Sequence, residues 1–218
     1  MQTTSSLPSI LASLRALIPH RDLGFDEAIQ IAEMQARKLV DLIADPTGIQ
    51  EHHIDGLPRI AVHRDALDVV SGMSHWNGQQ WIITINRGDP LVRQRFTLLH
   101  EFKHIVDHGA AARLYRGSSN QTAEEQAERA ADYFAGCALV GRRELKSAWG
   151  RGMQRAEDLA AHFGVSVQAI QVRLSQTGLD VIADRSPTPR CARPVRTPAG
   201  YRQRFRTAHS PRITRSYA

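Results

Sequence analysis

Apolar positions recur with a helical period over two stretches near the start of the chain. The first runs from Leu7 to Ile18. The second begins at Asp26, keeps apolar residues on one face as far as Ile43, and ends before Pro46. Spacings of three and four residues are typical of amphipathic helices that bury one face. We therefore expect a short N-terminal helix, packed on the body or on a partner, and then a longer structural helix.

The period changes between residues 57 and 87, where β-branched and aromatic residues are frequent. Three segments, residues 59–63, 69–76 and 79–86, have the composition of strands. Asn77-Gly78 is a typical hairpin turn and joins the second segment to the third. The pattern predicts a small antiparallel sheet. An edge strand of this sheet could hold an extended peptide by backbone hydrogen bonds, and the pattern does not identify that strand.

A further helix is predicted from residue 91 to residue 106, and it carries the sequence His100-Glu101-Phe102-Lys103-His104. Asp89 and Pro90 supply its start, as N-cap and first helical residue. Histidines four residues apart project from one face of a helix, so both imidazoles can reach a single Zn²⁺. Glu101 then lies beside the metal, where a general base can take a proton from water.

Zinc held by two histidines needs a third protein ligand if one position is to stay open. Thr122 and Glu125 form a capping box that begins another helix. Glu124, Glu128 and Asp132 share one face of that helix. We choose Glu128 as the third ligand, because Asp132, one turn later, can hydrogen-bond a ligating histidine and orient it. Glu124 is the alternative ligand.

Two segments, residues 93–104 and 128–135, resemble the ImmA/IrrE family of zinc metallopeptidases. The resemblance implies a Zn²⁺ cofactor and a peptidase activity. It makes His100, His104 and Glu128 the metal ligands and Glu101 the catalytic base. It also points to a DNA-binding repressor of the helix-turn-helix type as the protein substrate, cut once to relieve repression of stress or mobile-element genes.

The chain departs from the family pattern without losing a ligand. Lys103 stands where glycine is common, Asp132 where asparagine is common, and residues 140–141 are Val-Gly where the family often has Met-Pro. Lys103 places a cation next to a ligand. Its effect on substrate preference and helix packing depends on where its side chain lies.

Three residues are candidates to stabilise the oxyanion of the transition state, namely His108, Tyr115 and Tyr133. His108 lies one turn beyond His104, where a helix-end role is the alternative. A metzincin would need its third histidine at position 110, which is alanine, so that class is excluded.

Two further histidines, His52 and His53, stand next to each other after Glu51. Adjacent side chains point different ways on a helix or a strand. We therefore do not predict a metal site there.

The segment from residue 156 to residue 174 has the pattern of a helix, a glycine turn and a serine-capped helix. Taken alone, this helix-turn-helix pattern suggests DNA binding through Gln168, Gln171 and Arg173. In the ImmA/IrrE-like body, such a module instead resembles a packing or partner-recognition element.

Positive charge is concentrated at the C-terminal end of the chain. Residues 186–218 hold eight arginines and no acid, whereas the whole chain has a net charge of +6. The remaining residues 1–185 therefore carry −2. We expect a disordered basic tail, which contacts nucleic acid through its arginines and interleaved aromatic residues or is simply an unstructured extension.

Only two cysteines occur, Cys137 and Cys191, which does not form a disulfide framework. A reducing cytoplasm is the expected location. The N-terminal apolar residues are interrupted by Arg15 and lack a basic leader, so neither a signal peptide nor membrane association is expected.

Together these patterns predict an α+β protein with a mainly helical, zincin-like body. We divide it into an N-terminal helix (1–25), a metallopeptidase domain (26–142), a helix-turn-helix-like module (143–182) and a tail (183–218). The leading function is a zinc-dependent endopeptidase. A DNA-binding transcriptional regulator is the alternative, and a metal-bound module without turnover is a third class, against which the intact Glu101 argues.

Overall fold

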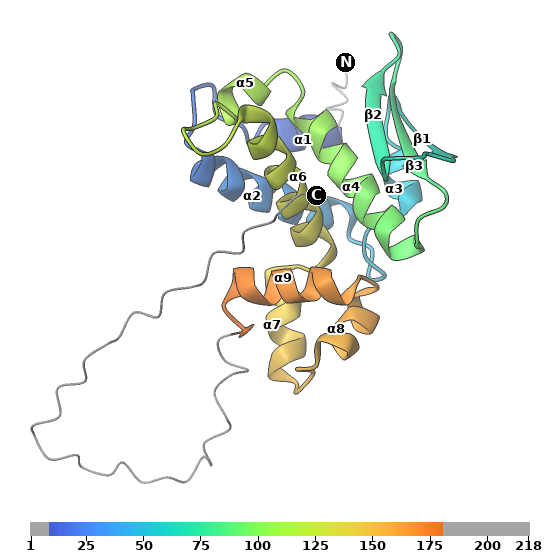
Figure 1. The fold of residues 1–218 in the computed structure, drawn as a ribbon, viewed down its shortest axis with the longest axis vertical. Helices are drawn as coiled ribbons and strands as arrows, with labels where there is room; N and C mark the ends of the chain where they lie inside the picture. Colours follow the sequence, from blue (N-terminus) through green and yellow to red (C-terminus); the bar gives the residue numbers. More distant parts are fainter. Residues whose placement is uncertain (1–8, 181–218) are drawn as a thin grey trace, which may run out of the picture. The chain divides into compact units, whose positions relative to one another are not determined.

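The structure is a computed structural model of the chain, and it describes residues 9–180. The helices in this part of the chain are α1 (Ile10–Arg15), α2 (Phe25–Ile43), α3 (Glu51–Asp55), α4 (Leu91–Asp107), α5 (Ala111–Leu114), α6 (Ala123–Leu139), α7 (Arg142–Gly150), α8 (Ala156–Phe163) and α9 (Val167–Thr177). The strands are β1 (Ile60–Asp65), β2 (Gly72–Trp76) and β3 (Trp81–Asn86) (Figure 1). The predicted α+β class is confirmed. The predicted tail, together with Cys191, lies outside the described residues.

The three strands form one sheet in the order β1-β3-β2. β2 and β3 are an antiparallel hairpin in which Trp76 lies opposite Trp81, and the turn at Asn77 closes with a 3.1 Å hydrogen bond from its N–H to the carbonyl of Gln80. β1 pairs with β3 in parallel. The prediction of an antiparallel sheet is therefore wrong for one of its two pairings, and the sheet is mixed. The reason is that β3 lies between its two predecessors instead of at the end of a meander.

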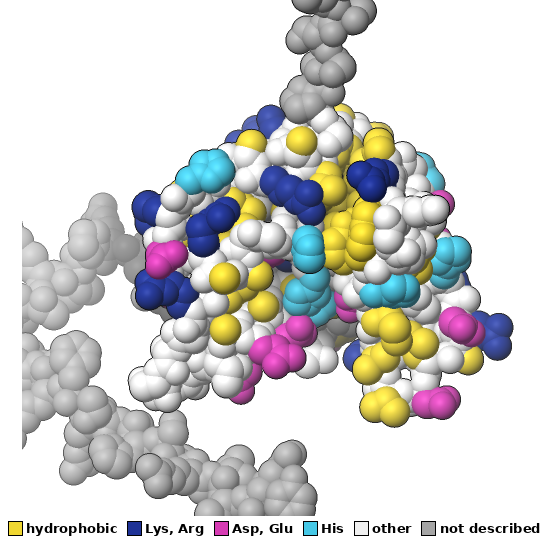
Figure 2. All heavy atoms as spheres, turned by 90° about the horizontal axis from the view of Figure 1, so that it is seen from above, with side chains coloured by type: hydrophobic (Ala, Val, Ile, Leu, Met, Phe, Trp, Pro, Cys, Tyr) yellow, Lys and Arg dark blue, Asp and Glu magenta, His cyan; other side chains and the backbone are white. Residues whose placement is uncertain are grey.

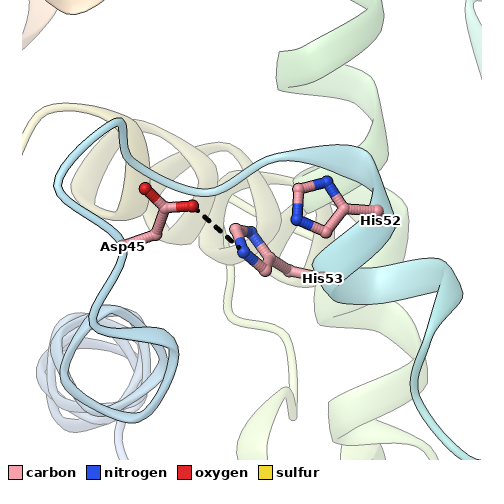
Figure 3. Close-up of side chains that lie close together, drawn as sticks. All are labelled: Asp45, His52 and His53. Atoms are coloured by element: carbon pink, nitrogen blue, oxygen red, sulfur yellow. Dashed lines mark ion pairs between the residues drawn. The ribbon is translucent and has the colours of Figure 1, made fainter.

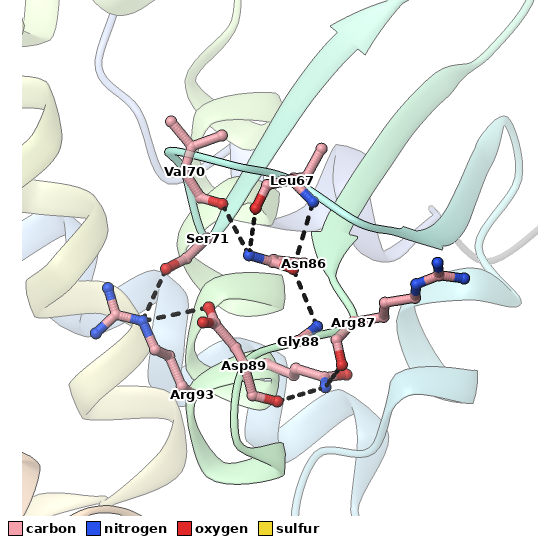
Figure 4. A network of polar contacts seen from close by, with 9 residues as sticks. Leu67, Val70, Ser71, Asn86, Arg87, Gly88, Asp89 and Arg93 are labelled. Atoms are coloured by element: carbon pink, nitrogen blue, oxygen red, sulfur yellow. Dashed lines mark hydrogen bonds and ion pairs between the residues drawn. The ribbon is translucent and has the colours of Figure 1, made fainter.

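The loop between β1 and β2 crosses the end of β3 and is held there by Asn86. The Asn86 Nδ2 donates to the carbonyl oxygens of Leu67, at 2.8 Å, and Val70, at 3.4 Å (Figure 4). Arg93, in the first turn of α4, donates from its Nε to the Ser71 Oγ at 2.7 Å. These contacts satisfy loop carbonyls and fix the end of the sheet to the start of α4.

Helices α2, α4 and α6 pack together, and α4 also lies against β2 and β3. Phe102 of α4 and Phe134 of α6 are fully buried, with ring centroids 6.4 Å apart. Helix α4 begins at Leu91 with Pro90 as its N-cap and no side-chain cap, so the expected Asp89 cap is not found. The capping box predicted for α6 is present: the Thr122 side chain accepts from the Glu125 N–H at 3.1 Å, and Glu125 accepts from the Thr122 N–H.

The N-terminal helix α1 packs on the body. Leu14 is fully buried in the main hydrophobic core. Arg15 donates to the carbonyl oxygens of Ile105, at 2.7 Å, and Val106, at 3.1 Å. Because the last carbonyls of a helix have no partner within it, Arg15 caps the C-terminal end of α4.

Helices α8 and α9 occupy the predicted positions, separated by Gly164 in the left-handed conformation and capped at Ser166. Arg173 of α9 is only 2% exposed, and its Nε donates to the carbonyl of Val140 at the end of α6. The expectation that Arg173 contacts DNA is therefore wrong, because its side chain is used to pack α9 on α6. Gln168 and Gln171 are exposed. Whether the two helices form a functional helix-turn-helix stays a prediction.

None of the helices in residues 9–180 has both the length and the apolar character needed to cross a membrane.

Candidate metal centre

Two neighbouring helices bring three of the predicted site residues together. His100 and His104 lie one turn apart on α4, and Glu128 faces them from α6. The two Nε2 atoms are 3.2 Å apart. The Glu128 Oε2 is 3.2 Å from the His100 Nε2, and its Oε1 is 3.2 Å from the His104 Nε2. Glu124, the alternative ligand, is not part of this group.

The three side chains lie close enough together to bind one metal ion. Ligand atoms bonded to Zn²⁺ at about 2.0 Å are separated from one another by about 3.3 Å. The 3.2 Å separation of the two Nε2 atoms matches one edge of such a tetrahedron, and each Nε2 lies 3.2 Å from a different oxygen of the Glu128 carboxylate. Two imidazoles and one carboxylate are also the donor set of many catalytic zinc sites. The residues present therefore fit a divalent metal, with the fourth position left for water or substrate.

Asp132 controls the outer nitrogen of His100. Its Oδ1 lies 2.9 Å from the His100 Nδ1, one helical turn after Glu128. A carboxylate can only accept at this contact, so Nδ1 carries the proton of the neutral ring and Nε2 is free to bind. The contact is the one that the predicted orienting role of Asp132 requires.

The two histidines differ in basicity. Burial lowers the pKa of His100, but the hydrogen bond and charge of Asp132, with the charges of Glu128 and Glu101, outweigh it, and the pKa is raised. Burial and the neighbouring charge of His100 lower the pKa of His104. In the metal-free protein, a proton therefore occupies His100 in preference to His104.

Glu101 is held by the sheet instead of by the metal ligands. It is nearly buried, and the Ser74 Oγ of β2 donates to its Oε2 at 2.8 Å. Gly72, two residues earlier on β2, makes this approach possible, because a Cβ there would lie 2.4 Å from the Thr97 Cγ2 of α4. The candidate base is therefore positioned against β2. Sequence reasoning missed Ser74, since the contact depends on a strand-to-helix packing that no local pattern encodes.

The sequence did not show which edge strand could hold an extended peptide, and the structure indicates β2. Within residues 9–180, β2 pairs with β3 alone, and both strands pack against α4. One edge of β2 is thus unpaired beside Glu101. On the face shown in Figure 2, histidine side chains gather in the middle beside acidic ones, with hydrophobic side chains alongside.

The other two oxyanion candidates and His108 have different neighbours. His108 directly follows the last residue of α4, and its ring lies edge-on to Trp81 with centroids 4.8 Å apart. The Tyr133 hydroxyl donates to Glu33 of α2 at 3.0 Å, and burial raises its pKa to about 12. Tyr115 is buried and donates to Asp107. Both tyrosine hydroxyls are occupied by carboxylates outside the site, so the structure disfavours Tyr133 as stabiliser and leaves His108 as the candidate.

Lys103 points away from the candidate metal ligands. Its side chain is fully buried, and Nζ lies 2.6 Å from each carboxylate oxygen of Asp107 and 2.8 Å from the Gln35 Oε1 of α2. Burial lowers the Lys103 pKa, although the Asp107 charge opposes this shift. The lysine therefore belongs to the buried packing between α4 and α2.

A second group of metal-binding residue types consists of Asp45, His52 and His53 (Figure 3). Contrary to the expected divergence, the two rings are close, with centroids 4.0 Å apart. However, the His53 Nδ1 accepts from the Gln50 N–H at 2.9 Å, so its Nε2 carries the proton and faces the Asp45 Oδ2 at 3.3 Å. The His53 Nδ1 thus caps α3 and the Nε2 pairs with Asp45, so the group does not offer a metal three free ligands.

The sequence profile of peptidase family M78, described as the IrrE N-terminal-like domain, matches residues 59–175. This match covers more than half of the chain and contains both helices of the candidate metal centre. The chain belongs to this family. The predicted ImmA/IrrE resemblance is confirmed, and membership of M78 indicates a metallopeptidase.

Among solved structures, the fold is similar to that of a Mycobacterium tuberculosis transcriptional regulator, with a TM-score of 0.57 and 18% sequence identity. The similarity covers 77% of this chain and 52% of that one, so the M78 chain spans about half the length of the regulator. At this identity the likeness concerns the fold alone. The curated proteins contain no match to the chain.

Proposed function

We propose that this protein is a zinc-dependent endopeptidase that cuts one extended segment of a specific protein substrate. The observation that carries the proposal is the convergence of His100, His104 and Glu128. The two Nε2 atoms lie 3.2 Å apart, and each lies 3.2 Å from one oxygen of the Glu128 carboxylate. Glu101 is not one of these three residues. When bound there, Zn²⁺ would polarise the peptide carbonyl and make water a better nucleophile.

The chain's own residues have separate tasks in this proposal. Asp132 keeps the proton on the outer nitrogen of His100. Glu101 accepts the proton of the attacking water and later gives it to the leaving amine. The Ser74 hydroxyl, 2.8 Å from Glu101, occupies one carboxylate oxygen and leaves the other for proton transfer.

The unpaired edge of β2 supports an extended substrate. A peptide added to this edge would form backbone hydrogen bonds and pass beside Glu101. Linkers between folded domains can become extended and pair with this edge, whereas segments in helices and sheets would first have to unfold. In keeping with the family, we propose a helix-turn-helix repressor as the substrate, cut once in the cytoplasm to relieve repression of stress or mobile-element genes.

The test is to incubate the zinc-loaded protein with repressors encoded by neighbouring genes and to map the products by mass spectrometry. We expect a single cut in one repressor, removed by chelation and by Glu101→Gln. Glu125→Gln is the matched control, because Glu125 lies in an exposed cap of α6 and does not reach the cluster.

Cleavage that persists in Glu101→Gln, or general digestion of unfolded casein, would contradict the proposal. Retention of metal by Glu101→Gln must be shown in the same experiment, since loss of metal would explain the inactivity without a role for Glu101 as base.

The alternative function is that of a DNA-binding regulator. Of the three residues proposed to contact DNA, Arg173 is buried and cannot do so. This function retains Gln168, Gln171 and the basic tail, which lies outside the described residues. If the tail binds nucleic acid, truncation after Asp184 should abolish a binding that also weakens steeply with salt, while peptidase activity survives. Equal binding by the truncated protein would place the contact on α8 and α9.

A further inference from the structure

A pocket of about 280 Å³ opens between α1, the segment before β1 and the β2–β3 hairpin. Its apolar walls include Leu11, Leu57, Trp76 and Trp81. The volume is sufficient for one large side chain. Neither the metal ligands nor Glu101 line it, so the catalytic proposal leaves this pocket unexplained.

The pocket lies on the same strand as the contact to the candidate base. Trp76 follows Ser74 by two residues on β2, so both side chains are on the face that packs toward α4. This spacing places Trp76 roughly 7 Å further along the free edge of β2. Trp81, opposite Trp76, contacts His108 just beyond the end of α4.

Arg59 contacts both aromatic walls of the pocket. Arg59, in a left-handed conformation with φ of 64°, accepts at its carbonyl from the Trp81 N–H at 2.9 Å. Its Nε donates to the carbonyl of Gln79 at 3.0 Å, and its guanidinium lies 4.9 Å from the ring centre of Trp76. The two indole rings are tilted, with centroids 5.6 Å apart. Because these contacts restrain the two rings, binding costs less side-chain entropy, although Trp76 is 41% exposed.

We propose that this pocket is a specificity subsite for a large apolar side chain of the substrate, which rests on the proposed peptidase function. An extended peptide paired antiparallel to β2, the more stable arrangement, runs from Trp76 toward Gly72. The bound residue then lies roughly two or three positions before the scissile bond. Arg15 and Arg59 line the same pocket, so it favours phenylalanine, leucine or methionine and rejects lysine and arginine.

Binding is tested on the metal-free full chain by tryptophan fluorescence, in a Trp149→Phe background so that Trp76 and Trp81 alone report. The probes are two capped six-residue Ala/Gly peptides with phenylalanine or lysine at the second position. We expect the phenylalanine peptide to bind at least tenfold more tightly, on the order of the transfer free energy of one buried aromatic side chain. Trp76→Ala should remove the difference, and Trp76→Phe should restore it.

His75→Ala is the matched control, because His75 lies on the opposite face of β2 and should leave the preference unchanged. Equal affinity for the two peptides, or a preference that persists in Trp76→Ala, would overturn the subsite. A fluorescence change on deleting residues 1–8, with no peptide present, would assign the pocket to the chain's own N-terminal segment and also overturn it.

A cleavage assay distinguishes the proposed subsite from the proposed peptidase activity. The zinc-loaded chain is incubated with a mixture of proteome-derived peptides, and the cut sites are read by mass spectrometry. Enrichment of large apolar residues two or three positions before the cut, lost in Trp76→Ala, supports the subsite. Cleavage without enrichment defeats the subsite and leaves the peptidase, whereas a binding preference without cleavage defeats the peptidase and leaves the pocket.

Discussion

Helix α4 carries two polar clusters on different faces, and they differ in how their hydrogen bonds are completed. Toward α2, Lys103 has three acceptors for its three N–H groups, and Asp107 also accepts from Tyr115. Toward α6, the inner nitrogens of His100 and His104 face only each other and Glu128. The first cluster is complete within the protein. In the second, the His100 Nε2 and the Glu128 carboxylate can only accept once the histidines are neutral, so the cluster has more lone pairs than protons and can bind a metal.

The largest effect is expected from breaking the complete cluster. Lys103→Met leaves the buried Asp107 carboxylate without its cation, and loss of one partner of a buried pair costs about 3–5 kcal/mol. The free energy of unfolding, measured with urea on the metal-free protein, should fall by this amount. The double variant Lys103→Met/Asp107→Leu should recover most of it. A single-variant cost under about 1 kcal/mol would show that the pair is not the stabilising element we infer.

Removing a donor from the incomplete cluster should affect metal and not folding. Glu128→Ala is expected to weaken Zn²⁺ binding by more than about 100-fold, beyond the effect of losing an outer contact. The side chain of Glu128 is 55% exposed, so unfolding of the metal-free protein should change little. Glu124→Ala, one turn earlier, is the control and should bind normally. The reverse order of the two variants would overturn the choice of ligand.

A smaller effect on Zn²⁺ affinity is expected from changing Asp132, which contacts His100 on the side away from Glu128. Asp132→Asn should weaken Zn²⁺ binding by about 10–100-fold, because His100 loses its orienting carboxylate. The pKa of His100 is raised, so in the wild type a proton competes with metal and affinity should fall as the pH drops through that raised pKa. In Asp132→Asn, this fall should begin at a lower pH. Metal titrations across the pH range measure both the affinity and its pH dependence. An unchanged pH profile in Asp132→Asn would exclude Asp132 as the cause of the raised His100 pKa.

The smallest effect concerns the helix that delivers Glu128. Thr122→Ala removes the side-chain cap of α6 and should cost about 1 kcal/mol of unfolding free energy. Zn²⁺ affinity should stay within about twofold of the wild type, because the cap lies more than a turn from the ligand. Thr122→Ser restores the hydroxyl and serves as the control. A large loss of metal in Thr122→Ala would mean that the cap, and not helix packing, sets the position of Glu128.

The parts that could be predicted from sequence are those set by local periodicity. The one-turn spacing of His100 and His104, and of Glu128 and Asp132, follows from the helical repeat, and the Thr122 cap follows from a three-residue pattern. What could not be predicted depends on residues distant in sequence. The burial of Lys103 requires Gln35, and that of Arg173 requires the end of α6. The insertion of β3 between β1 and β2 likewise has no local signature.

That strand order has a consequence for how the chain folds. The hairpin of β2 and β3 joins neighbouring segments, whereas the parallel pairing of β1 with β3 must close a loop that contains all of β2. Closing a longer loop costs more chain entropy, and nonlocal pairs form more slowly. We therefore expect the hairpin to form first and β1 to dock afterwards. β2, which contacts the candidate base, would then belong to the earliest nucleus of the sheet together with β3, and these two strands carry Trp76 and Trp81. Variants in the hairpin should slow refolding more than variants in β1.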